Sequence, residues 1–260
     1  MKTKALLRKL STFFPKKLAE AYDYPGLQVG KLKEDTNNVL LCLDFDEDVL
    51  NYILNNKLES QIDLIITHHP FIFGNKKDIL ANDNNKNYLY HKMEELNIPI
   101  YSFHTNFDSG KNGMNDALVE KLGLINTHRL ISEPMACGGE LPHEMDIKEF
   151  AKYALEKLNV DYGLLLNYGN KTIKSAAIIG GGGWRGFKAA QLESYDIFIS
   201  GDIPHHGRRD VVANKYNYLD LPHEVENIFM EQMKKILLSF DNSINVSCLY
   251  QEQFPEVICK

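Results

Sequence analysis

Short apolar runs alternate with segments of helical periodicity along most of the chain. Strand-like runs cover residues 38–45 and the stretch that ends at His68 and His69, and a helical pattern lies between them. Continuous apolar runs are typical of strands buried on both faces, and their alternation with helices favours largely parallel strand pairing. The sequence therefore predicts an α/β fold whose strands are flanked by helices.

The chain has 260 residues, enough for one large domain or two modest ones. The alternation of helices and strands recurs in the second half, after a stretch without clear periodicity at 126–144. We therefore expect two similar α/β lobes with mixed sheets. The first comprises residues 1–125, completed by the C-terminal segment 215–260, and the second comprises residues 126–214.

Charge and composition exclude several classes of protein. The net charge of -6 argues against a nucleic-acid partner, which would require a basic face. No apolar run approaches the ~20 residues of a membrane span. The basic N-terminus lacks the apolar core and cleavage site of a secretory signal, so we expect a packed surface helix and a cytoplasmic protein. The scattered cysteines Cys42, Cys137, Cys248 and Cys259 are expected to be reduced thiols.

Histidines follow two of the predicted strands in the first half. His68 and His69 end the strand in "DLIITHHP", and "FHTNFD" places His104 and Asp108 after the next strand. An imidazole beside a core is costly unless its nitrogens bind something. Two simpler interpretations stay open, in which the histidine pair reaches solvent and Asp108 caps a helix or an Asx-turn.

The second half carries two similar groups. "SGDIPHH" brings Asp202 and His206 to another strand end, although a capped turn would use the same residues. "LPHEVE" places His223 in the first turn of a helix, with Glu226 three residues later on the same face. Ligands of open α/β sheets bind outside the carboxyl ends of the strands, so these groups are candidates for one common site.

The candidate ligands combine imidazole with carboxylate and include no thiolate. This set suits Zn, Fe, Mn, Co or Ni ions and does not distinguish among them. There are more candidate ligands than one tetrahedral ion needs, which indicates two divalent metal ions per chain. Asp108 and Glu226 are the candidates to bridge them.

A glycine-rich segment, residues 181–186, fits the pattern G-x-G-x-x-G between a predicted strand and a helix. A dinucleotide-binding loop has this form. The next strand, however, ends in "SGDIPHH" and offers no lone acid for a ribose. We therefore favour a turn that allows close backbone approach, with weak phosphate binding by its N–H groups as the alternative.

Several motifs in series resemble the Nif-three-like dinuclear metal-centre proteins, or GTP cyclohydrolase 1 type 2 homologues. They are "FFPKKLAEAYDYPGLQVG", "LIITHHPFIF", "FHTNFDSGKNGMNDALVEKLGL", "SGDIPHH" and "LPHEVENIF", in the order found in that family. The resemblance covers nearly the whole chain. Two departures are "LPHEVE", where a glycine usually precedes the histidine, and "AYDYPG", which replaces a version that contains tryptophan.

The resemblance implies that the metal ligands are His68, His69, Asp108, His223 and Glu226. It also implies two α/β lobes with the metal site in the cleft between them, assembled as a toroidal homohexamer. His104 would line the site, and His104, Asp202 or His206 would transfer protons or support the ligands.

The function that we expect is that of a metal-dependent hydrolase of a small phosphorylated or nucleotide-like substrate. The family name points to GTP, although the metal motifs specify no guanine pocket. The alternative is a metal-handling or metal-chaperone protein without turnover, and a third interpretation is an interaction scaffold whose metals are structural.

Overall fold

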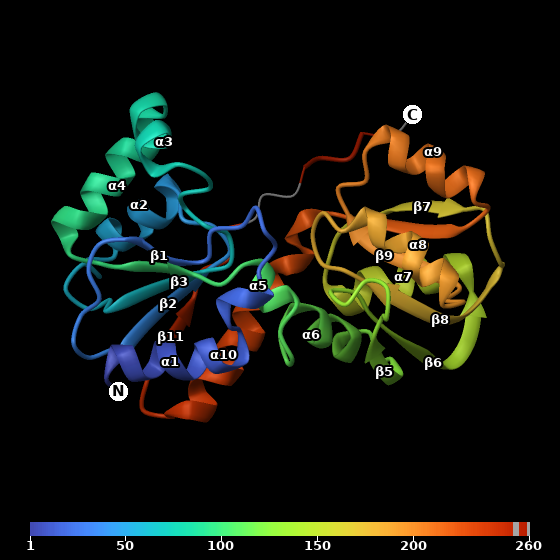
Figure 1. The fold of residues 1–260 in the computed structure, drawn as a ribbon, viewed down its shortest axis with the longest axis horizontal. Helices are drawn as coiled ribbons and strands as arrows, with labels where there is room; N and C mark the ends of the chain where they lie inside the picture. The colour runs from blue at the N-terminus through green and yellow to red at the C-terminus, as the bar shows by residue number, and fades with distance from the viewer. Residues whose placement is uncertain (252–254, 259–260) are drawn as a thin grey trace. The chain divides into compact units, whose positions relative to one another are not determined.

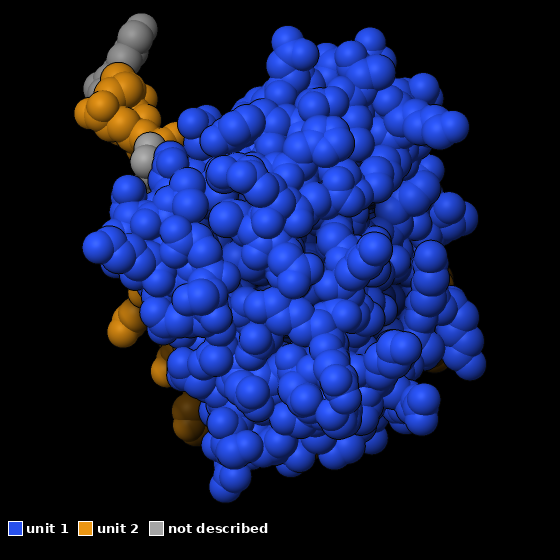
Figure 2. Space-filling model, turned by 90° about the vertical axis from the view of Figure 1, so that its left-hand side faces the viewer, with its two compact units in different colours: residues 1–113, 229–251 blue, residues 114–228, 252–260 orange. Residues whose placement is uncertain are grey.

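The structure is a computed structural model in which residues 1–251 and 255–258 are described. Contacts divide the chain into two compact units, Met1–Gly113 with Phe229–Gln251 and Met114–Ile228 with Glu252–Lys260. Figure 1 shows the course of the chain, and Figure 2 colours the first unit blue and the second orange. Each unit has its own sheet.

The first unit contains a five-stranded sheet in the order β1-β4-β3-β2-β11. Strand β1 is antiparallel to β4 at one edge, and the other neighbours pair in parallel. The strands are β1 (Gly26–Val29), β2 (Asn38–Cys42), β3 (Leu64–Thr67), β4 (Ile100–Ser102) and β11 (Asn245–Cys248). Because β2, β3 and β4 are parallel, their carboxyl ends lie along one edge of the sheet.

Helices cover both faces of this sheet, with α2 and α4 on one face and α1 and α10 on the other (Figure 1). The helices are α1 (Thr3–Phe13), η1 (Lys16–Leu18), α2 (Glu47–Asn55), α3 (Lys76–Asn82), α4 (Asn84–Leu96), α5 (Thr105–Asp108) and α10 (Ile228–Phe240). Helix α1 buries Leu6, Leu7 and Leu10 at helical spacing, so the packed helix predicted for the N-terminus is present.

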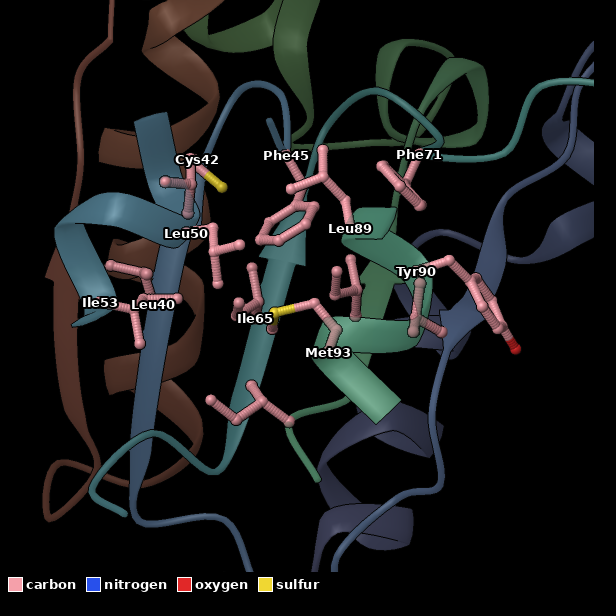
Figure 3. Packing of buried hydrophobic residues seen from close by; sticks show 14 of the residues in the cluster. Leu40, Cys42, Phe45, Leu50, Ile53, Ile65, Phe71, Leu89, Tyr90 and Met93 are labelled. Atoms are coloured by element: carbon pink, nitrogen blue, oxygen red, sulfur yellow. The ribbon is translucent and has the colours of Figure 1, made fainter. Parts of the chain in front are cut away.

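The core between the sheet and helices α2 and α4 fixes the strands that carry the histidines. Figure 3 shows Leu40 of β2 and Ile65 of β3 packed with Leu50 of α2 and Met93 of α4. All four side chains are buried. Complete burial of such a side chain contributes about 1.5–3 kcal/mol, so this cluster holds the central strands firmly.

Asp63 aligns the starts of β2 and β3. Its Oδ2 accepts hydrogen bonds from the backbone N–H groups of Asn37 (2.9 Å) and Asn38 (3.1 Å). The register that follows pairs Cys42 with Thr67. One residue further on, the His68 N–H donates to the Leu43 carbonyl at 3.1 Å. The hydrogen bonds of Asp63 at the starts of β2 and β3 therefore help to fix the register that positions the carboxyl ends of these strands, where the site lies.

The second unit contains a six-stranded mixed sheet in the order β5-β6-β8-β9-β10-β7. Strands β8, β9 and β10 pair in parallel, and the remaining pairs are antiparallel. The strands are β5 (Ile125–Arg129), β6 (Cys137–Asp146), β7 (Leu164–Asn167), β8 (Thr172–Ile178), β9 (Ile197–Gly201) and β10 (Asn217–Leu221). Its helical segments are α6 (Met114–Lys121), α7 (Ile147–Leu158), η2 (Trp184–Gly186), α8 (Phe187–Leu192), α9 (His205–Ala213) and η3 (His223–Asn227). The predicted α/β class with mixed sheets flanked by helices is confirmed.

The stretch 126–144, expected to be irregular, forms most of β5 and β6. Paired glycines such as Gly138 and Gly139 are typical of turns, but both lie inside β6. Neighbouring atoms approach these positions too closely to leave room for a side chain. A Cβ on Gly138 would overlap the ring of Tyr195, and one on Gly139 would lie 2.7 Å from the Ile125 carbonyl oxygen. The glycines therefore permit close packing of the sheet.

One further expectation differs from the structure. Strand β10 falls in the segment 215–260 assigned to the first lobe, but it pairs with β9 and β7 in the second sheet. The asparagine-rich segment 82–87 contains the end of α3 and the start of α4, whose first turn is capped by Asp83.

Cys42, Cys137 and Cys248 are free cysteines, and Cys259 lies outside the described residues. Burial, together with the nearby Asp116 carboxylate, raises the pKa of the Cys137 thiol to about 12. Within residues 1–251 and 255–258, every helix is too short or too polar to cross a membrane.

Candidate metal centre

Three neighbouring strand ends of the first unit carry chemistry-bearing side chains. Asp44 follows β2, His68 and His69 follow β3, and His104 follows β4. Because these strands are parallel neighbours, their ends bring the side chains to the same edge of the sheet. The predicted convergence of His68, His69 and His104 is present within this unit.

His68 is fully buried and its ring orientation is fixed. Its Nδ1 donates to the carbonyl oxygen of Phe103 at 2.9 Å. Its ring packs against Phe107 and Phe229, with centroid distances of 6.4 Å and 5.2 Å. The Nε2 atom faces Asp108, whose Oδ1 lies 3.6 Å away.

His69 and His104 are each held by a carboxylate. The Nδ1 of His69 lies 2.9 Å from Oδ2 of Asp44, and the Nδ1 of His104 lies 2.8 Å from Oδ1 of Asp23. The other oxygen of Asp23 accepts hydrogen bonds from the backbone and hydroxyl of Thr105. Burial would raise the pKa of Asp23, but the hydrogen bonds from His104 and Thr105 outweigh it and lower that pKa.

The three imidazoles form one group that fits a metal ion. One ring nitrogen from each of His68, His69 and His104 lies within 4.8 Å of those of the other two. Because Nδ1 is already hydrogen-bonded to an oxygen atom in all three rings, Nε2 is the nitrogen that would coordinate a metal ion. Metal-bound histidines in proteins almost always have this outer hydrogen bond, which fixes the tautomer and the ring. Asp108, 5% exposed, adds a carboxylate beside His68.

In the second unit, His223 lies between two carboxylates. Its Nδ1 is 2.5 Å from Oδ2 of Asp202, and its Nε2 is 3.0 Å from Oε2 of Glu226. Asp202 follows β9 and His223 follows its parallel neighbour β10. Burial lowers the pKa of His223, but the hydrogen bonds that its ring donates to the carboxylates of Asp202 and Glu226 outweigh it and raise the pKa to about 11. The predicted pairing of His223 with Glu226 is present.

The glycine run forms a tight turn beneath Glu226. Gly181 has a φ of +64°, and a Cβ at this position would overlap Oε1 of Glu226. The Gly181 carbonyl accepts hydrogen bonds from Gly201 N–H at 2.7 Å and from the Ser200 hydroxyl at 2.8 Å. The turn therefore makes room for the glutamate, in agreement with the close backbone approach favoured from the sequence.

His206, expected at a strand end, lies with His205 in the first turn of helix α9, directly after Pro204 at the N-cap position. Both are exposed, and the His206 ring contacts Trp184 edge to face at 5.4 Å. Among the described residues, His206 belongs to no group able to hold a metal. A role in proton transfer for His206 stays a prediction.

Asp23 and Asp44 are the residues of the site that sequence reasoning missed. A signal existed for Asp44, which follows an apolar strand as the histidines do. Asp23 precedes its strand and lies 81 positions from His104 in the sequence, so spacing gave no indication of the pair.

Comparisons with known proteins identify one family. Residues 1–255 match the model of a family described as Duf34/NIF3 (NGG1p interacting factor 3). A protein of Clostridium perfringens is 31% identical over 229 residues, covering 86% of this chain and 86% of that protein. A protein of Ureaplasma parvum is 31% identical over 265 residues, covering 95% of both. Both are named GTP cyclohydrolase 1 type 2 homolog.

Two solved structures show the same fold. A hypothetical protein of Staphylococcus aureus superposes with a TM-score of 0.85 at 25% identity and covers 99% of each chain. A Bacillus cereus protein related to NIF3 gives a TM-score of 0.86 at 20% identity, covering 100% of this chain and 99% of that chain.

Proposed function

The chain belongs to the Duf34/NIF3 family, and from this premise we propose that it is a dinuclear divalent-metal-binding protein that hydrolyses a small phosphorylated or nucleotide-like substrate. The proposal is carried by one observation. His68, His69 and His104 each have Nδ1 bonded to an oxygen acceptor, and their ring nitrogens lie within 4.8 Å of one another. Such an arrangement supports metal binding through Nε2.

Two groups of side chains would hold the metal. His68, His69 and Asp108 supply two imidazoles and a carboxylate from the first unit. His223 and Glu226 supply one of each from the second. When bound, divalent metals in such sites polarise phosphoryl oxygens and lower the pKa of a coordinated water to near 7. No thiolate is involved, so Zn, Fe, Mn, Co and Ni all suit the donor set.

The remaining side chains would orient the imidazole rings of the site. Asp44 and Asp23 accept the Nδ1 protons of His69 and His104, which directs Nε2 of each ring into the group. The His104 side chain is 18% exposed and would line the site as the third imidazole of the group. Asp202 holds the Nδ1 proton of His223 in the same way.

The first experiment is elemental analysis of the purified protein. We expect about two transition-metal ions per wild-type chain, and a loss of metal in His69→Ala and Asp108→Ala variants that remain folded by circular dichroism. The matched control is His91→Ala, because His91 is an exposed histidine on α4 outside the site. A wild type that cannot be loaded with metal, or variants that retain it fully, would refute the proposed centre.

The second experiment separates a hydrolase from a metal carrier. The metal-loaded protein is incubated with GTP, which the names of the relatives suggest, and with simple phosphomonoesters and phosphodiesters. Metal-dependent turnover that His69→Ala abolishes supports the hydrolase. Transfer of the metal to an acceptor protein, without turnover of any of these compounds, supports metal handling instead.

We also propose the homohexameric assembly that the family resemblance implies. Sedimentation equilibrium on the full chain tests it directly, because a monomer and a hexamer differ sixfold in mass.

A further inference from the structure

Three exposed aromatic side chains lie together beside the histidine group of the first unit. Tyr22 and Tyr24 flank Asp23, the residue that holds His104, and Phe73 follows His69 by four positions. The exposed fractions are 59% for Tyr22, 46% for Tyr24 and 47% for Phe73. We call these three residues the aromatic cluster.

Phe73 is the centre of the aromatic cluster. Its ring centroid lies 5.7 Å from that of Tyr24, 6.3 Å from that of Tyr22 and 6.3 Å from that of His104. The interplanar angles to Tyr24 and His104 are 77° and 84°. Phe73 therefore meets Tyr24 and His104 edge to face and Tyr22 at a tilt of 54°, and about half of each aromatic side chain remains exposed.

The cluster is held in place by hydrogen bonds of Gln28 on β1. The Gln28 amide nitrogen donates to the Tyr24 carbonyl at 2.8 Å and to the Ser102 hydroxyl at 3.0 Å. The Gln28 amide oxygen accepts from the Ile72 N–H at 3.1 Å. One side chain thus ties the segment of Tyr24, the segment of Phe73 and the end of β4 together, and the exposed rings are positioned before any ligand arrives.

We propose that the aromatic cluster binds the planar ring of the substrate, with a nucleobase-like heterocycle resting on Phe73 while its phosphorylated end reaches the histidine group. This inference rests on the proposed function, because it assigns a substrate class to the same site. Aromatic side chains bind bases through their π-faces, as in proteins that bind single-stranded nucleic acids. Three side chains offer far less than the ~800 Å² that each partner buries in a stable protein interface, which favours a small ligand.

The test compares two probes that differ only in the base, guanosine 5′-monophosphate and ribose 5-phosphate. Equilibrium dialysis of the full-length protein, with and without added Zn²⁺ or Mn²⁺, measures both affinities. We expect the wild type to bind guanosine 5′-monophosphate at least tenfold more tightly than ribose 5-phosphate. Phe73→Leu and Tyr22→Leu should each reduce that preference about five- to tenfold and leave the affinity for ribose 5-phosphate unchanged.

Tyr88→Leu is the matched control, since Tyr88 is 54% exposed on α4, outside the cluster. It should keep the full preference. Equal binding of the two probes by the wild type, or an unchanged preference in both cluster variants, would overturn the inference. A change of assembly state in Phe73→Leu would overturn it as well, because the rings would then form a contact between copies.

Failure of the proposed function gives a different result. If the proposed function is wrong, the wild type contains no bound metal. The preference for guanosine 5′-monophosphate over ribose 5-phosphate can be measured whether or not metal is bound.

Discussion

Nδ1 of His104 lies 2.8 Å from Oδ1 of Asp23, and the two residues are separated by 81 positions in the chain. The same relationship recurs between His69 and Asp44, and in the second unit between His223 and Asp202. In the last two pairs, the histidine and the aspartate follow adjacent parallel strands. Both units thus contain the same kind of pair, in which an imidazole is oriented by a carboxylate from another strand end or loop.

Removing the charge of Asp23 should weaken metal binding without removing a metal ligand. In Asp23→Asn the amide no longer stabilises the His104 Nδ1–H as a carboxylate does, so the ring is held less firmly and is less basic. Loss of such an outer partner typically costs 10–100-fold in metal affinity. Competition with a chelator measures the dissociation constant of the protein for Zn²⁺.

Asp48→Asn is the control for this experiment, because it removes one exposed negative charge from α2 in the same unit. It should leave the affinity within about twofold of the wild type. Equal affinities for Asp23→Asn and the wild type would show that the anchoring of His104 plays no part in metal binding.

Much of the site could be predicted because its ligands lie close to strand ends. His68, His69 and His104 follow apolar runs, and parallel strands place such residues at one edge of a sheet. The contact between His223 and Glu226 follows from their i, i+3 spacing. These inferences need only local periodicity and the rule that relates strand direction to the position of ligands.

The rest depends on contacts between residues distant in sequence. Asp23 reaches His104 only after β1 and β4 have paired at the sheet edge, and local patterns give no indication of that pairing. In β6, the glycines of "CGGELPHE" indicate a turn by composition, but they lie in a strand because Tyr195 packs against them. In both cases tertiary packing decides the structure, and local propensity does not.

Gly181→Ala should disturb the second group of ligands. The residue has a φ of +64°, and the added Cβ would overlap Oε1 of Glu226. A residue other than glycine in the left-handed region costs about 1–3 kcal/mol, so both the free energy of unfolding and the metal content should fall. Gly182→Ala is the matched control, since its nearest neighbour atom would be Oδ2 of Asp202 at 3.8 Å. If the two variants unfold at the same denaturant concentration, the steric account of Gly181 is wrong.

Asp63 should make the stability of the protein depend on acid pH. Burial would raise the pKa of Asp63, but hydrogen bonds from Asn37 and Asn38 and the Lys33 ammonium outweigh it and lower that pKa from 3.8. A carboxyl group with a lowered pKa in the folded state stabilises above its unfolded pKa, and this contribution is lost as pH falls through the folded value. Asp63→Asn should therefore cost about 1–2 kcal/mol at pH 7.

Urea unfolding of the wild type and Asp63→Asn between pH 7 and pH 3 measures this contribution. The difference in free energy of unfolding should stay constant down to about pH 4 and shrink below it. Asp161→Asn, an exposed position in the second unit, should show no such difference. A gap between wild type and Asp63→Asn that widens as the pH falls would contradict the assigned cause.

Removal of metal should lower the midpoint of thermal unfolding of the wild type and change that of a ligand variant much less. A metal that binds only the folded chain raises its free energy of unfolding, by about 2.7 kcal/mol when the free ion is at 100 times its dissociation constant. Thermal unfolding with added Zn²⁺ and with chelator should therefore give clearly different midpoints for the wild type and for His91→Ala. In Asp108→Ala the two midpoints should approach each other, because the buried carboxylate beside His68 is gone. A zinc-dependent shift in Asp108→Ala as large as that of the wild type would place the stabilising ion elsewhere in the protein.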